Sequence, residues 1–373
     1  MDKYAIFFPQ FHQVKVNDDA WGVGFTDWAL VASANAFDTW ERRAPAGGFY
    51  DLNKSGEVRK QFQDAANAGL DGFGIYHYWF EDGPELSAVE RYLNDEQIPD
   101  RFGYFFIWAN ENWSRRWAGK DTELLKTVAT RPTRLQVRKH VEYLKPFMTS
   151  EGYKCVDGRP VFVIYRPEFF ADLESSVKLY REEFGKAGIN VSLGFFVSGV
   201  SDVDYSELFD FCYLFEPRLF FKLSGIGRSR LVSYLFRWLT HNIPYAYLEA
   251  LSEFFNRVLG RNSKSHEFSS FVEYFKSIER SNIIKSLACP VQNVLTCGWN
   301  NAPRYRDSFV ALTAPSRNQF VEIVSSAVED SRFSKKYPLM CNAWNEWSEG
   351  AALEECSYLG RNLQEWYLQV ENN

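Results

Sequence analysis

Residues 72–78 read GFGIYHY and residues 102–109 read FGYFFIWA, and the amphipathic segment ELSAVERYLNDEQ (85–97) lies between them. Two short apolar runs joined by a helical pattern are typical of parallel β-strands connected by a crossover helix. The same alternation continues in both directions along the chain. It predicts eight strands, at Tyr4–Phe8, Gly72–Tyr78, Phe102–Ala109, Val161–Arg166, Ser192–Val197, Phe209–Glu216, Val291–Cys297 and Leu339–Trp344. It also predicts helices near 57–69, 85–97, 133–149, 171–186, 204–209, 266–281, 316–330 and 358–370.

Eight strand–helix units in 373 residues predict a single (β/α)8 barrel of the TIM type, spanning 1–373. The alternative is an open, doubly wound sheet, which predicts a glycine-rich phosphate-binding turn after the first strand. The first predicted strand ends instead in Pro9-Gln10-Phe11-His12, and the chain holds no Walker A pattern. Two segments exceed a minimal barrel: a long first loop at 13–56 and an insertion after strand six at 217–264.

The composition limits the classes of protein to which the chain can belong. Hydrophobic residues make up 46% and charged residues 24%, which is typical of a globular protein with a sizeable core. The formal net charge of −6 argues against a nucleic-acid-binding protein, which normally carries a basic excess. Aromatic residues reach 17%, and their flat apolar rings with polar edges suit sugar binding as well as core packing.

We expect a cytoplasmic chain. The apolar run Tyr4–Phe8 is too short for the h-region of a signal peptide, and the six Cys include no Cys-x-x-Cys pair. No apolar stretch reaches the roughly 18 residues that span a membrane. The insertion 217–264 is basic, with eight Lys or Arg between Arg218 and Lys264 against two Glu. This pattern favours a lid helix packed on the barrel, and peripheral association with the inner face of the cytoplasmic membrane is the alternative.

Polar and aromatic side chains follow seven of the eight predicted strands, at the end where the active sites of this barrel lie. Buried Asn, Glu and Arg side chains cost free energy unless they are paired, so their concentration at one end predicts a functional pocket. With Trp28 of the first loop, the candidate substrate-binding residues are Gln10, His12, Trp28, His77, Tyr78, Trp108, Asn110, Glu111, Trp113, Arg116, Arg166, Glu216, Trp299, Asn300, Arg304, Trp344 and Asn345.

The strongest single motif is NEWSEG at 345–350, directly after the last predicted strand. It brings two carboxylates, Glu346 and Glu349, within three residues of each other. Glycosyl chemistry commonly needs one group to move a proton at an oxygen and a second carboxylate as nucleophile, base or stabiliser of positive charge. Two solvated Glu in an exposed loop are the alternative. The position between Trp344 and Trp347 at a strand end favours catalysis, and Glu111 is a third candidate carboxylate.

Metal binding receives little support from the sequence, and we expect neither a metal nor another cofactor. His12 and His77 both follow strands and could meet in space, but no tight ligand spacing accompanies them. Hydrogen bonding to sugar hydroxyls is the favoured role for both. The Asp202-Val203-Asp204 motif resembles the Asp-x-Asp that holds a metal and a nucleotide-sugar diphosphate, but an N-cap at the start of a short helix is the favoured interpretation.

Taken together, these motifs make the chain resemble the WbsX-like family of bacterial polysaccharide-biosynthesis glycosyltransferases, whose barrel domain is similar to family-99 glycoside hydrolases such as endo-α-mannosidases. The resemblance runs from the first predicted strand to the last and omits the insertion 217–264. The matching stretches are Phe8 to His12, Trp21 to Trp28, Asp71 to Phe73, His77 to Phe80, Trp108 to Trp113, Arg116-Trp117, Gly158 to Pro160, Trp299 to Asn301, Arg304, Trp344 to Gly350 and Leu353-Glu354.

The resemblance implies roles for the two carboxylates. In the hydrolases a similar E-W-x-E segment is catalytic, which implies that Glu346 deprotonates or orients the sugar 2-hydroxyl and that Glu349 is the general acid/base. Ser348 stands where the hydrolases often have His, so their full mechanism does not carry over directly. A transferase implies two partners, a nucleotide-sugar or lipid-linked sugar donor and a glycan acceptor.

Three functions therefore remain open. The first is a glycosyltransferase that builds a surface polysaccharide such as O-antigen or capsule. The second is an endo-acting glycoside hydrolase that uses the same pocket. The third is a carbohydrate-binding barrel without catalysis.

Overall fold

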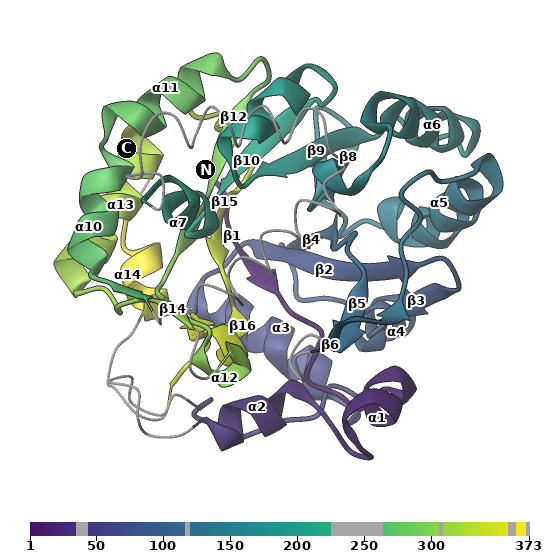
Figure 1. The fold of residues 1–373 in the computed structure, drawn as a ribbon, viewed down its shortest axis with the longest axis horizontal. Helices are drawn as coiled ribbons and strands as arrows, with labels where there is room; N and C mark the ends of the chain where they lie inside the picture. Colours follow the sequence, from purple (N-terminus) through teal and green to yellow (C-terminus); the bar gives the residue numbers. More distant parts are fainter. Residues whose placement is uncertain (35–43, 116–119, 225–263, 306–308, 357–362, 371–373) are drawn as a thin grey trace.

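The computed structural model describes residues 1–34, 44–115, 120–224, 264–305, 309–356 and 363–370. Its centre is a closed barrel of eight parallel strands, in which β1 pairs with both β2 and β15 (Figure 1). This architecture confirms the predicted (β/α)8 barrel. In order around the barrel the strands are β1 (Lys3–Phe7), β2 (Gly72–Phe80), β4 (Gly103–Trp108), β8 (Arg159–Ile164), β9 (Ser192–Val197), β10 (Phe211–Phe215), β12 (Val291–Thr296) and β15 (Leu339–Asn342).

Helices surround this barrel, and side-chain caps fix where several of them begin. Thr133 and Ser316 form capping boxes with Gln136 and Gln319, so two helices start where the sequence predicts. The predicted helix 266–281 is instead two helices, because the Ser277 side chain accepts a hydrogen bond from the Arg280 N–H and starts a second one. The helices are α3 (Glu57–Ala68), α4 (Ala88–Asp95), α5 (Arg134–Met148), α6 (Leu173–Lys186), α7 (Arg218–Ser224), α10 (Phe268–Phe275), α11 (Ile278–Ser286), α13 (Arg317–Glu329) and α14 (Leu363–Leu368), with 3-10 turns η2 (Pro167–Phe169) and η3 (Val200–Glu207).

The barrel interior is filled by side chains, so the sheet encloses a packed core rather than a pore. At Gly74 an added Cβ would lie 2.8 Å from Ile107, 3.0 Å from Met340 and 3.2 Å from Phe105. At Gly72 it would lie 2.4 Å from the Tyr4 ring. The contacts join strands that are not all neighbours in the sheet, so these residues face inward. The two glycines on β2 therefore leave the volume that larger side chains of other strands occupy.

Short elements cover the carboxyl end of the barrel and build the site. The first loop supplies α1 (Lys15–Trp21) and α2 (Asp27–Ser33), and α2 contacts both α12 (Ala302–Tyr305) and η5 (Trp347–Glu349). Figure 1 shows α2 and α12 near β16. The remaining strands are β3 (Gly83–Glu85), β5 (Trp113–Arg115), β6 (Lys120–Lys126), β7 (Cys155–Val156), β11 (Lys264–His266), β13 (Trp299–Asn300), β14 (Val310–Leu312), β16 (Asn345–Glu346) and β17 (Ala351–Ala352).

The insertion after strand six is described only at its two ends, by α7 and β11. The predicted lid or membrane-facing helix at 217–264 therefore lies mostly outside the described residues. Within the described parts of the chain, no helix is both long and apolar enough to cross a membrane.

Candidate active site

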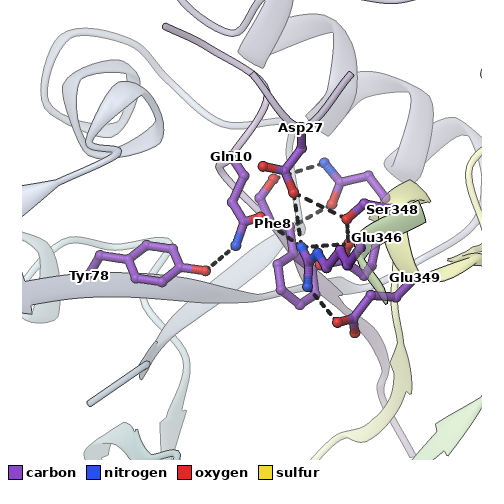
Figure 2. A network of polar contacts seen from close by, with 9 residues as sticks. Phe8, Gln10, Asp27, Tyr78, Glu346, Ser348 and Glu349 are labelled. Atoms are coloured by element: carbon purple, nitrogen blue, oxygen red, sulfur yellow. Dashed lines mark hydrogen bonds and ion pairs between the residues drawn. The ribbon is translucent and has the colours of Figure 1, made fainter. Parts of the chain in front are cut away.

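One arginine organises the polar side chains above β1 and β15. Arg304, on α12, donates from Nη1 to Glu349 Oε1 at 2.5 Å and from Nη2 to Asp27 Oδ2 at 2.9 Å. Nη2 also lies 3.2 Å from Glu346 Oε1 and 3.1 Å from Gln10 Oε1. We name Arg304, Asp27, Glu346 and Glu349 the carboxylate cluster. Figure 2 shows its three acids converging, with Gln10 reaching on to Tyr78.

Ser348 ties two of these acids together. Its hydroxyl lies 2.5 Å from Glu346 Oε1 and 3.1 Å from Asp27 Oδ2. A hydroxyl has one proton and can donate it to one of the two oxygens at a time. The other oxygen of Glu346, Oε2, is buried and has no hydrogen-bond partner among the described residues. The cluster therefore keeps one buried acceptor oxygen that the described residues do not satisfy.

Burial and crowding change the acidity of both predicted catalytic residues. Burial raises the pKa of Glu346 to about 8, and the nearby Glu349 and Asp27 add to the rise while Arg304 opposes it. Burial also raises the pKa of Glu349, against the effect of Arg304. The Glu349 side chain is 14% exposed and that of Glu346 is 1% exposed, so Glu349 lies nearer the opening. Glu346 can therefore exchange a proton near neutral pH.

Tyrosines form the inner wall beside the cluster. Gln10 donates from Nε2 to the Tyr78 hydroxyl at 2.5 Å, which fixes the amide that also contacts Arg304. The Tyr76 ring packs against Phe8 at 4.4 Å and against Tyr165 at 5.5 Å between centroids. Tyr76, Tyr78 and Tyr165 are all inward-facing, and they give the mouth of the barrel an aromatic lining with hydroxyl edges.

The far side of the mouth carries a second polar group at the end of β8. Arg166 donates to Glu111 Oε2 at 3.0 Å and to Glu168 Oε1 at 3.1 Å. The Asn110 side chain bonds the backbone of Arg166 twice: its Nδ2 donates to the Arg166 carbonyl at 2.7 Å, and its Oδ1 accepts from the Arg166 N–H at 2.7 Å. Asn110 therefore holds two strand ends together, and in this group Arg166 is buried while Glu111 is partly exposed.

Four predicted binding residues face the helices instead of the pocket, and for these the structure corrects the prediction. His77 bonds Glu90 at 3.1 Å and His140 at 3.0 Å, between β2 and the helices α4 and α5. Trp108 packs on His140 and Tyr180. Glu216 accepts from Tyr274 and Arg280, and Trp344 donates to Gln61 at 2.7 Å. Successive strand residues point to opposite faces, so a polar residue near a strand end has no guarantee of facing inward.

Other predicted residues support the site from behind. Asn345 bonds the backbone of Phe8 through its Oδ1 at 2.8 Å and its Nδ2 at 3.0 Å, which docks β16 onto the end of β1. Asn300 accepts from the Ala302 N–H at 2.9 Å and starts α12. Trp28 stacks on Phe11 at 4.0 Å and donates to the Tyr50 carbonyl.

His12 is buried with no partner for either ring nitrogen among the described residues. Burial lowers its pKa to about 4, with Arg91 adding to the fall and Asp51 opposing it. The charged groups that change the pKa of His12 thus belong to α4 and to the loop before α3. The predicted contact between His12 and His77 does not form, because both ring nitrogens of His77 bond other residues.

Three aromatic or basic predictions remain. Trp113 packs against Tyr78 at 5.2 Å and so borders the tyrosine wall. Trp299 is half-buried on β13, three residues before α12 begins. Arg116 lies outside the described residues.

Asp202 of the Asp202-Val203-Asp204 motif lies at the start of η3, where its side chain bonds Ser198 and Ser201. The N-cap residue of η3 is Gly199 and not Asp202.

Sequence reasoning missed Asp27, Ser348, Tyr76, Tyr165 and Arg218 as members of the mouth. The signal for Tyr76 was present, because period-two alternation on β2 places it on the same face as Tyr78. Asp27 gave no such signal, since it enters the site from a loop helix. Among the described residues, no group of three or more His, Cys, Asp or Glu is arranged to hold a metal ion.

Comparisons with known proteins were made on sequence and on structure. A family model described as "Glycosyltransferase WbsX" matches residues 3–369. Two proteins of Xanthomonas campestris pv. campestris, each named "Uncharacterized protein WxcX", are 28% identical to the chain. The match to the protein of strain B100 extends over 369 residues and that to the protein of strain ATCC 33913 over 364, and each covers 95% of this chain and 47% of the relative. The chain thus spans about half the length of these curated relatives.

The solved structures that resemble the chain are barrels of glycoside hydrolase type. The endo-alpha-mannosidase of family GH99 from Bacteroides thetaiotaomicron has a TM-score of 0.55 at 12% identity, with 98% of this chain and 94% of that one covered. A "Glycoside hydrolase-like protein" has a TM-score of 0.52 at 14% identity, with 95% and 87% covered. At such identities the likeness concerns the fold alone.

Proposed function

The chain belongs to the WbsX glycosyltransferase family, and on that premise we propose that it transfers a sugar from an activated donor to a glycan acceptor during surface polysaccharide synthesis. The observation that carries the proposal is the carboxylate cluster. Three acids share one arginine at the mouth of the barrel, two of them on the NEWSEG motif. The donor is a nucleotide sugar or a lipid-linked sugar, and the sugar transfer takes place at the inner face of the cytoplasmic membrane.

The chemistry follows from the surplus of negative charge. When the bond between the anomeric carbon and the leaving group breaks, the leaving group keeps the electron pair and the sugar ring gains positive charge. Fixed carboxylates stabilise that charge because they need no reorganisation at the moment of reaction. Glu349 takes the proton of the acceptor hydroxyl as the acceptor oxygen bonds to the anomeric carbon.

Glu346 has a different part in this proposal. Its deeper burial and its unpartnered Oε2 suit an interaction with a hydroxyl of the bound sugar, and the resemblance to the hydrolases points to the 2-hydroxyl. A base is most effective when its pKa lies near the working pH, and burial raises the pKa of Glu346 to about 8. Ser348 and Arg304 hold its other oxygen in place, and both of them also bond Asp27.

Glu349→Gln tests the proposal. We expect the purified variant to fold normally and to lose about 10²–10⁴-fold in transfer rate, because a positioned general base contributes that much. The assay supplies a panel of labelled nucleotide sugars and polyprenyl-linked sugars with glycan acceptors, and separates transferred sugar from free sugar. Glu216→Gln is the matched control: it changes a buried acid at a strand end that faces the helices, and the folded fraction should keep its turnover.

Two outcomes contradict the proposal in different ways. Release of sugar to water from a neutral glycan, with no transfer to any acceptor, would identify the endo-acting hydrolase. Unchanged product formation in Glu349→Gln, together with unchanged sugar binding, would favour the carbohydrate-binding barrel. The cost of keeping three acids around one arginine disfavours the second outcome, because a binding site has no need of that charge.

A further inference from the structure

We propose that Arg166, Arg218 and Lys222, here called the basic rim, bind the phosphate group of the sugar donor on the side of the barrel mouth opposite the carboxylate cluster. The inference rests on the proposed function and names the class of leaving group, a sugar diphosphate or monophosphate ester. The three residues come from the end of β8 and from α7, whereas the cluster comes from α2, α12, β16 and η5.

The basic rim adjoins the tyrosine wall. Arg218 donates from Nη1 to the Tyr165 hydroxyl at 2.8 Å, and its guanidinium lies 5.8 Å from the centroid of that ring. Tyr165 in turn packs edge-on against Tyr76 at 5.5 Å. Arg218 is partly exposed, so its side chain is accessible from the mouth.

Residues of the basic rim and of the carboxylate cluster both affect the pKa of the Tyr165 hydroxyl. Burial raises the pKa of Tyr165 to about 12, with Arg218 and Arg166 opposing the rise and Glu349 and Glu111 adding to it. Tyr165 therefore lies close enough to Arg218 and to Glu349 for both charges to influence it. A phosphorylated sugar bound against the tyrosine wall would have its sugar ring on the side of the acids and its phosphate on the side of the cations.

The cations of the rim crowd one another. Lys222 has its pKa lowered by burial and further by the positive charges of Arg218 and Arg166, while Asp202 and Glu168 oppose the fall. At Gly199 an added Cβ would lie only 3.1 Å from Lys222 Nζ, so glycine leaves space for the ammonium group. An anion between these cations would relieve their repulsion.

The acids beside the basic rim are Asp202, Glu168 and Glu111, and Glu111 bonds Arg166 at 3.0 Å. Asp202 is already bonded to Ser198 and Ser201, and Glu168 is bonded to Arg166 through one oxygen only. The buried Glu168 Oε2 has no hydrogen-bond partner among the described residues. Three cations here face three acids, Asp202, Glu168 and Glu111, whereas in the carboxylate cluster one cation faces three acids. The half of the mouth with the basic rim, here called the basic half, is therefore balanced in charge, and the half with the carboxylate cluster, the acidic half, has an excess of acids.

This polarity matches the transition state of transfer from a phosphorylated donor. Positive charge develops at the anomeric carbon and negative charge on the departing phosphate oxygen as the bond between them breaks. The acidic half stabilises the first and the basic half the second, and arginine is well suited to phosphate because its planar donors match two oxygens. A neutral leaving group, as in a glycan hydrolase, has no use for the basic half.

Isothermal titration with inorganic pyrophosphate tests the inference on the full chain. We expect wild-type protein to bind pyrophosphate, and Arg218→Gln to weaken binding at least about tenfold, as expected for one lost hydrogen bond to a charged group. Arg332→Gln removes an arginine that is paired with Asp330 on the surface, and it should bind as wild type does. Lys222→Met is a second variant of the rim, and circular dichroism establishes that each protein is folded.

Further titrations separate the two sources of the phosphate. A nucleoside diphosphate that binds more tightly than pyrophosphate indicates a nucleotide-sugar donor, and farnesyl pyrophosphate that binds more tightly indicates a lipid-linked one. No pyrophosphate binding by wild type, or equal affinity in wild type and both folded rim variants, overturns the inference. Glu349→Gln should bind pyrophosphate normally, so loss of transfer there with no effect of Arg218→Gln would leave the proposed function standing and the inference refuted.

Discussion

Two buried arginines lie next to strand-end glutamates, one inside the barrel mouth and one outside the barrel wall. Outside, Arg280 of α11 contacts Glu216 Oε1 at 3.4 Å and Asn293 Oδ1 at 2.5 Å, and it lies 3.8 Å from the centroid of Phe275. Glu216 receives further hydrogen bonds from Tyr274 and from the Phe220 N–H. One positive and one negative charge meet there, and both oxygens of the acid are satisfied.

Inside, Arg304 meets three carboxylates, and one oxygen of Glu346 is left without a partner among the described residues. Burying charge costs free energy in both places, but only the outer pair is balanced. Burial alone therefore does not distinguish a structural ion pair from a reactive one. The distinguishing features are the charge imbalance and the unsatisfied acceptor, which a substrate can use.

The largest effect that we predict falls on the balanced pair. Arg280→Met should lower the free energy of unfolding by about 3–5 kcal/mol, because it leaves Glu216 buried without its cation. Guanidinium unfolding measures this effect, and the folded fraction should transfer sugar at the wild-type rate. The surface variant Arg332→Met serves as control and should change stability by less than about 0.5 kcal/mol. Equal stability in the two variants would remove the contrast between the two arginines.

A smaller effect is expected on the pH dependence of the free energy of unfolding, and it comes from the carboxylate cluster. The pKa of Glu346 rises from its ordinary 4.5 to about 8 in the folded protein, so folding favours its protonated form. Its contribution to stability is fully present below pH 4.5 and is lost as pH rises through about 8. Glu346→Gln should abolish this loss, on the order of a few kcal/mol, in unfolding experiments between pH 5 and pH 9.

Glu354 should account for a part of the pH dependence of stability that remains in Glu346→Gln. Burial also raises the pKa of Glu354 to about 7, so this acid keeps a part of the pH dependence in the variant. Glu354→Gln should remove that part separately. Identical pH profiles for wild type and Glu346→Gln would mean that Glu346 titrates as an ordinary carboxylate, and its role as a base near neutral pH would be lost.

The smallest predicted effect concerns the tyrosine wall. Tyr78→Phe removes the acceptor of the Gln10 amide and should cost about 1 kcal/mol of stability, because a half-buried donor loses its partner. In the assay the KM for the sugar should rise while kcat changes little, since Gln10 keeps its contact with Arg304. Tyr213→Phe is the matched control: its hydroxyl donates to the Pro338 carbonyl at the other end of the barrel. A KM that is equally unchanged in both variants would exclude Tyr78 from binding.

The sequence by itself determined the barrel and the place of the carboxylate pair. Apolar runs separated by amphipathic segments need little tertiary information to identify, because strand and helix periodicities differ. Capping residues such as Thr133 and Ser316 located two helix starts within one residue. The NEWSEG motif pointed to Glu346 and Glu349 because it follows a predicted strand and has Trp344 and Trp347 beside its acids.

Only the tertiary structure decided which strand-end residues meet. A shift of one residue along a strand reverses the face, so His77 and Trp108 turned to the helices while Tyr76 and Tyr78 turned inward. Asp27 reached the cluster because the first loop folds back as α2 beside α12 and η5. Contacts between segments more than 250 residues apart depend on how loops close over the barrel, and no local pattern in the chain encodes that closure.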